Sequence, residues 1–109
     1  MTQTTDGFVT VARVGEILEG GVRVVRLEDQ AIAVFLIDGA YYALDDVCTH
    51  DGGPLGEGTL DGYEIACPRH GARFDIRNGC AKSMPATEDT VVHDVRVTGD
   101  NVFVKINDV

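Results

Sequence analysis

Most of the chain's cysteine and histidine falls in two short pairs. The first pair is Cys48-Thr49-His50, and after sixteen further residues the second is Cys67-Pro68-Arg69-His70. A short spacer lets one loop place two ligands beside the same ion. Thiolate combined with imidazole is the ligand set of many zinc sites and of some iron–sulfur clusters. The two pairs therefore predict a metal centre held by four side chains.

Loop-forming residues follow both pairs. Asp51-Gly52-Gly53-Pro54 follows the first pair and Gly71 follows the second, and glycine lets the backbone approach a bound group closely. Two alternatives remain at this point. One is a structural zinc ion, although the usual zinc spacings begin with two cysteines rather than with a cysteine and a histidine. The other is a set of buried cysteines and histidines that bind no metal.

The order and spacing of the four residues resemble the signature of Rieske [2Fe–2S] proteins, in which two cysteines hold one iron and two histidines hold the other. The resemblance covers most of the chain, because the flanking strands also fit the small Rieske ferredoxins. It implies one cluster per chain, with Cys48 and Cys67 on one iron and His50 and His70 on the other. The two imidazoles would face solvent as the electron exit. Arg69 would either contact partner carboxylates or shield the cluster.

Strand-like segments with turn residues between them, such as the tight hairpin turn expected at Asp38-Gly39, indicate an all-β fold. The expected strands are residues 8–14, 22–27, 31–37, 40–44, 58–60, 63–66, 72–76, 91–97 and 101–106. Helical periodicity is absent except for a single possible turn at 14–18. By resemblance, the whole chain (1–109) is one Rieske domain, an antiparallel β-sandwich or barrel. Its framework would be residues 1–44 and 81–109, with a cluster-binding subdomain inserted at about 45–80.

Charge and composition limit the partners and the location that we expect. Eighteen acidic residues against nine basic ones give a formal net charge of −9, so nucleic acid is not an expected partner because its phosphates would be repelled. The acidic surface either serves only solubility or steers docking onto basic patches of redox partners. We expect a cytoplasmic protein without a membrane anchor, because the start of the chain is polar and the longest apolar run, 31–37, is seven residues.

Two residues outside the pairs need separate mention. Cys80 has no disulfide partner once the cluster takes the other two cysteines, which fits a reducing compartment. We expect it to be a small, buried or half-buried residue. His93 lies in an alternating segment, where we expect an ordinary strand residue.

The positions after the second ligand pair bear on the redox potential. High-potential Rieske proteins carry a serine two residues and a tyrosine four residues after the second ligand histidine, whereas this chain has Ala72 and Phe74 there. Neither side chain can donate a hydrogen bond to the cluster. The resemblance therefore implies a potential near the low end of the Rieske range, roughly −150 mV.

The same resemblance implies an electron carrier and not an enzyme. Rieske oxygenases add a mononuclear iron held by two histidines and a carboxylate, and here only His93 remains after the two ligand histidines. The expected role is a monomeric ferredoxin that takes single electrons from a flavin-containing reductase to a terminal Rieske oxygenase of an aromatic-ring dioxygenase system. Two alternatives stay open: a small Rieske subunit of a larger reductase such as nitrite reductase, and a zinc-stabilised interaction module.

Overall fold

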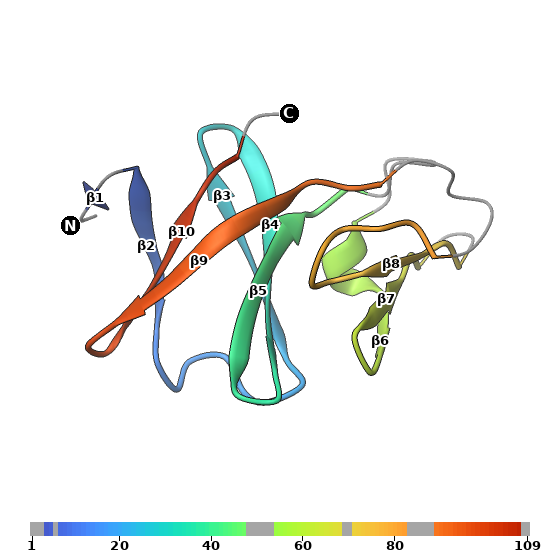
Figure 1. Ribbon diagram of the computed structural model, residues 1–109, viewed down its shortest axis with the longest axis horizontal. Coiled ribbons are helices and arrows are strands. Elements are labelled where there is room, and N and C mark those ends of the chain that lie inside the picture. Colours follow the sequence, from blue (N-terminus) through green and yellow to red (C-terminus); the bar gives the residue numbers. More distant parts are fainter. Residues whose placement is uncertain (1–3, 6, 48–53, 69–70, 83–88, 108–109) are drawn as a thin grey trace.

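The computed structural model describes residues 4–5, 7–47, 54–68, 71–82 and 89–107 (Figure 1). Within these ranges the chain forms ten β-strands in two antiparallel sheets and a single 3-10 turn, so the predicted all-β class is confirmed. The strands are β1 (Thr4–Thr5), β2 (Phe8–Arg13), β3 (Val22–Leu27), β4 (Gln30–Ile37), β5 (Ala40–Asp45), β6 (Thr59–Asp61), β7 (Glu64–Ala66), β8 (Arg73–Asp75), β9 (Val92–Thr98) and β10 (Asn101–Lys105), and the 3-10 turn is η1 (Leu55–Glu57). No helix in the described ranges has the length and apolar character needed to span a membrane.

The larger sheet has seven strands in the order β1-β2-β10-β9-β5-β4-β3. Its two halves meet where the start of β9 pairs with β5, through Ala43 opposite His93 and Leu44 opposite Val92. The halves share a core of buried apolar residues: Ala12, Ile17, Ile32, Val34, Ala43, Val102 and Val104. We call this set the framework core. Because it draws on β2, β4, β5 and β10, the sheet folds over on itself as a sandwich.

The smaller sheet has three strands in the order β6-β7-β8, and it lies beside β5, away from β1 and β2 (Figure 1). It shares a second core with the larger sheet, made of Ala33, Phe35, Leu44, Leu55, Ile65, Cys67, Ala72, Phe74 and Ile76. We call this set the junction core. Strand β4 contributes Ile32 and Val34 to the framework core and Ala33 and Phe35 to the junction core. Both faces of β4 are therefore covered, which explains its continuous apolar sequence.

Each predicted strand begins and ends within one residue of an observed strand. The tight turn expected at Asp38-Gly39 is present, with both residues at positive φ (55° and 79°). Two features were not predicted, strand β1 and the 3-10 turn η1. The single turn expected at 14–18 is present at residues 14–16, as a hydrogen-bonded turn and not a helix, and Ile17 after it is buried in the framework core.

Candidate metal centre

Of the four predicted ligands, Cys67 is the one that the structure describes; Cys48, His50 and His70 lie outside the described residues. Cys67 follows β7 directly and is 3% exposed, within the junction core. Ala72 and Phe74, both completely buried, belong to the same core. A thiol at the end of a strand, surrounded by apolar side chains that exclude water, fits the role of a cluster ligand.

Two backbone hydrogen bonds close the loop that carries the second pair. The Cys67 N–H donates to the Ala72 carbonyl oxygen at 2.7 Å, and the Gly71 N–H donates to the Cys67 carbonyl oxygen at 3.0 Å. Gly71 has φ +77°, a conformation that favours glycine. The two ends of this loop are thus fixed to each other, and β7 and β8 continue from them as a paired hairpin through Ala66 and Arg73.

The segment that leads to the first pair is also fixed on two sides. The Asp45 N–H donates to the Val91 carbonyl oxygen and the Asp46 N–H donates to the Ala31 carbonyl oxygen, both at 2.9 Å. The buried Asp46 carboxylate accepts a hydrogen bond from the Gly56 N–H. Burial raises the pKa of Asp46, and the Gly56 hydrogen bond partly opposes this rise. We call residues 45–47, which directly precede Cys48, the first stem.

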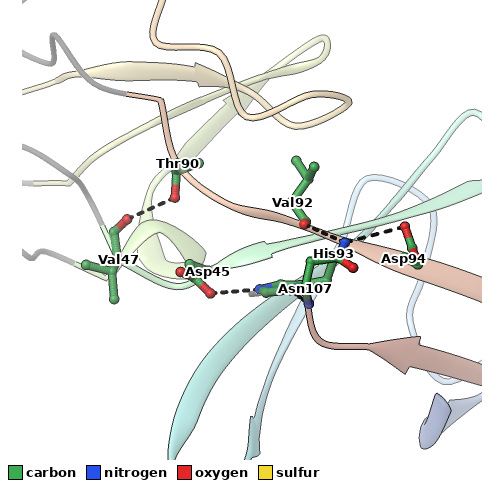
Figure 2. Close-up of polar contacts among 7 residues, drawn as sticks. All are labelled: Asp45, Val47, Thr90, Val92, His93, Asp94 and Asn107. Carbon is green, nitrogen blue, oxygen red and sulfur yellow. Dashed lines mark hydrogen bonds and ion pairs between the residues drawn. The ribbon is translucent and has the colours of Figure 1, made fainter. Parts of the chain in front are cut away.

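A hydrogen-bonded path connects the first stem to the smaller sheet. The Thr90 hydroxyl donates to the Val47 carbonyl oxygen at 3.4 Å, as Figure 2 shows. The Thr90 N–H donates to the Gly79 carbonyl oxygen at 2.8 Å, and the Gly79 N–H donates to the Asp75 carbonyl oxygen at 2.7 Å. Asp75 ends β8, the strand that follows the second ligand loop. The supports of the two ligand loops are therefore joined through the segment that enters β9.

No group of three or more cysteine, histidine, aspartate or glutamate side chains able to hold a metal ion occurs among the described residues. This is expected if the site is formed mainly by Cys48, His50 and His70, which lie outside those residues. What the described part of the site does show is a buried thiol and two anchored loop supports.

Comparison with known proteins decides the family. Residues 7–104 match the family model of the Rieske [2Fe–2S] domain. The chain belongs to the Rieske family. A Rieske domain is defined by its iron–sulfur cluster, so the family assignment favours an iron–sulfur centre over the zinc alternative.

Two curated Rieske relatives match almost end to end. The ferredoxin component of a naphthalene 1,2-dioxygenase system from Pseudomonas aeruginosa is 33% identical over 103 residues, which are 94% of this chain and 99% of the relative. The ferredoxin component of the p-cumate 2,3-dioxygenase system of Pseudomonas putida is 37% identical over 101 residues, which are 91% of this chain and 86% of the relative.

Solved Rieske structures share the fold. The ferredoxin of carbazole 1,9a-dioxygenase from Nocardioides aromaticivorans IC177 has a TM-score of 0.90 at 26% identity, covering 94% of this chain and 100% of that one. A chain from a complex of reduced oxygenase and oxidized ferredoxin in carbazole 1,9a-dioxygenase has a TM-score of 0.87 at 34% identity, covering 93% and 94% of the two chains.

Sequence reasoning missed a group of polar residues beside the first stem. His93 was expected to be an ordinary strand residue, but its side chain is buried and hydrogen-bonded at both ring nitrogens, to Asp45 and to Asn107. The only sequence signal was a histidine within an alternating apolar segment, which does not identify its partners. Cys80 is half-buried, as expected.

Proposed function

We propose that this chain is the ferredoxin component of an aromatic-ring dioxygenase system, a one-electron carrier of the Rieske type. The observation that carries the proposal is the end-to-end match to proteins named as ferredoxin components of such systems, at 33–37% identity. The match covers 99% of the ferredoxin component of the naphthalene 1,2-dioxygenase system, so that relative has no room for an additional catalytic domain.

The proposed ligands are Cys48 and Cys67 on one iron and His50 and His70 on the other, with one [2Fe–2S] cluster per chain. When bound, the cluster accepts and releases one electron. The chain's own contribution is to hold two loops together. The buried position of Cys67, the closed second loop and the anchored first stem support this assignment. We also propose a single domain, with residues 1–44 and 81–109 as framework and about 45–80 as the cluster-binding insert.

The proposed partners are a flavin-containing reductase as electron donor and a terminal Rieske oxygenase as electron acceptor. A chain with 34% identity to this one was solved in a complex of reduced oxygenase and oxidized ferredoxin, which supports the oxygenase as a partner. The chain itself would not be the oxygenase. Once two of the three histidines are assigned to the cluster, His93 is the remaining one, and both of its ring nitrogens are hydrogen-bonded, to Asp45 and to Asn107. It is therefore not placed to hold a mononuclear iron. We further propose that the protein works as a cytoplasmic monomer.

Reconstitution tests the role directly. The purified holoprotein is combined with NADH, a flavin-containing ferredoxin reductase and the terminal oxygenase of a naphthalene or p-cumate dioxygenase system, and oxygen consumption and hydroxylated product are followed. The expected result is product formation that depends on the chain and is lost with Cys67→Ser. No stimulation with either oxygenase would contradict the carrier role. Purification of the chain only as a permanent part of a larger reductase would favour the alternative of a reductase subunit.

A further inference from the structure

His93 lies at the contact of three chain segments. Its residue is 6% exposed, at the start of β9 where that strand pairs with β5. Ring nitrogen Nε2 lies 2.7 Å from Asp45 Oδ1, and Nδ1 accepts a hydrogen bond from the Asn107 N–H at 3.0 Å. Figure 2 shows the imidazole between these two residues. Every polar atom of this side chain therefore has a partner.

These partners determine which nitrogen of His93 carries the proton. A backbone N–H can only donate, so Nδ1 must present its lone pair to Asn107. The ring proton is then on Nε2, which donates to the Asp45 carboxylate. Asn107 is held in turn, because its side-chain amide donates to the Val92 carbonyl oxygen at 3.0 Å and to Asp94 Oδ1 at 3.4 Å.

The acceptor of this hydrogen bond is the first residue of the first stem. Asp45 ends β5 and precedes Cys48 by three positions, with Asp46 and Val47 between them. The Asp45 N–H is bonded to Val91, so residues 91–93 hold both the backbone and the side chain of Asp45. The Asp45 side chain is 27% exposed, so it is the imidazole bond, and not burial alone, that fixes its orientation.

We propose that His93 is a positioning residue for the iron–sulfur centre: through Asp45 it fixes the end of β5 and thereby the place from which the first ligand pair starts. This inference rests on the proposed cluster. It predicts that the hydrogen bond between His93 and Asp45 affects the cluster itself, and not only the overall stability of the fold.

Two substitutions of His93 separate its two hydrogen bonds. His93→Asn can keep an acceptor near the position of Nδ1 but loses the donor to Asp45, whereas His93→Gln can place an amide N–H near the position of Nε2. Val104→Ala is the control, because it truncates a completely buried residue of the framework core that is not part of the first stem. Each holoprotein is examined for its reduced-state EPR g-values, its rate of cluster loss to a chelator and its thermal unfolding midpoint.

The expected result is that His93→Asn shifts the g-values and speeds cluster loss by about fivefold, the factor that corresponds to one net hydrogen bond. His93→Gln should restore both toward the parent, and Val104→Ala should lower the unfolding midpoint without a change in g-values. If His93→Asn fails to fold, Asp45→Ala carries the test, because it removes the acceptor and leaves the imidazole in place.

The role of His93 is refuted if His93→Asn, or Asp45→Ala in its place, keeps the g-values of the parent and loses its cluster no faster than Val104→Ala does. The rates of cluster loss are compared at equal distances below each variant's thermal unfolding midpoint. Rescue by His93→Gln supports it, and absence of rescue in a folded Gln variant counts against it. A parent protein that binds no iron–sulfur cluster would instead refute the proposed function, so the two failures are distinguishable.

Discussion

The larger and the smaller sheet of this molecule are held together in different ways. Strands of the larger sheet are mostly five to eight residues long, and β4 pairs with β3 and β5 along nearly its whole length. Each strand of the smaller sheet has three residues. An isolated sheet of such short strands is marginal in water. The smaller sheet must therefore depend on what it packs against.

Two sets of contacts supply that support. In the junction core, Phe35 and Leu44 of the larger sheet pack with Ile65 and Phe74 of the smaller one. At the surface, the Tyr63 ring meets Tyr42 edge to face, with ring centroids 6.1 Å apart, and the Arg77 guanidinium lies 4.2 Å above the Tyr63 ring. We call the larger sheet the scaffold and the smaller sheet the insert, since the smaller sheet depends on the larger one for its packing. The proposed ligand loops belong to the insert and to the first stem, which leads into it.

The largest predicted effect comes from emptying the junction core. Phe74→Ala removes a completely buried ring and should lower the free energy of unfolding by about 3–5 kcal/mol. Hydrogen exchange should show the loss of protection first in β6–β8 and later in β2 and β10. Equal loss of protection in both sheets would contradict the view that the insert depends on the scaffold.

Two glycines with nearly the same backbone angle test the link between the sheets. Gly79 has φ +78° and Gly20 has φ +80°, so alanine at either should cost about 1–2 kcal/mol from backbone strain alone. A Cβ at Gly79 would lie 2.3 Å from the Thr90 carbonyl oxygen, whereas nothing lies within 4 Å at Gly20. Gly79→Ala should therefore destabilise by about 1–3 kcal/mol more than Gly20→Ala, because the buried hydrogen bonding between residues 79 and 90 is disturbed. Denaturant unfolding measures both, and equal costs would refute the importance of this link.

A third prediction concerns the cluster's surroundings in the insert. Ala72→Ser introduces a hydroxyl donor into a completely buried position near Cys67, and Phe74→Tyr introduces one in β8. If either hydroxyl reaches a cluster sulfur, the bond is stronger in the reduced state. A difference of ~1–2 kcal/mol then raises the potential by roughly 40–90 mV for one electron. Voltammetry of parent and variants measures the change. If neither variant changes the potential, the lack of hydrogen-bond donors at positions 72 and 74 does not explain a low potential.

The smallest predicted effect is pH-dependent. Arg77 Nε and Nη2 donate to the two carboxylate oxygens of Asp75 at 3.0 and 2.8 Å, and these bonds lower the pKa of Asp75 below its ordinary value. The stability that the pair contributes is complete above the ordinary Asp pKa and is lost as pH falls through the lowered one. Arg77→Gln should thus be less stable than the parent at neutral pH, with a difference that shrinks below about pH 4.

Urea unfolding at a series of pH values measures that difference. Arg23→Gln is the matched control, since Arg23 and Glu16 form an ion pair at 3.2 Å in which both side chains are nearly half exposed. Exposed pairs contribute little to stability, so this variant should stay close to the parent at every pH. An Arg77→Gln deficit that did not change between neutral and acid pH would contradict the assigned role of the Asp75 charge.

Much of the scaffold could be predicted because its signals are local. Alternation of apolar and charged residues predicted β3 at its observed bounds, and Asp38-Gly39 marked the hairpin between β4 and β5. The family could be predicted from the spacing of the two cysteine–histidine pairs, which the match over residues 7–104 confirmed.

The supports of the site could not be predicted, because they depend on contacts between distant parts of the chain. His93 and Asp45 are 48 residues apart, and no local pattern relates them. The 3-10 turn η1 has three residues, too few to show a period. Sequence spacing thus predicts which side chains would bind a metal, whereas the contacts that fix the supporting segments are seen only in the folded structure.

Pulsed EPR of the reduced holoprotein labelled with ¹⁵N-histidine shows whether two cysteines and two histidines share one iron pair. Coupling of the unpaired electron to nitrogens of two histidine rings, with iron and sulfide present at two each per chain, is the predicted result. A reduced cluster without histidine coupling, or a protein that contains no iron, would contradict the account.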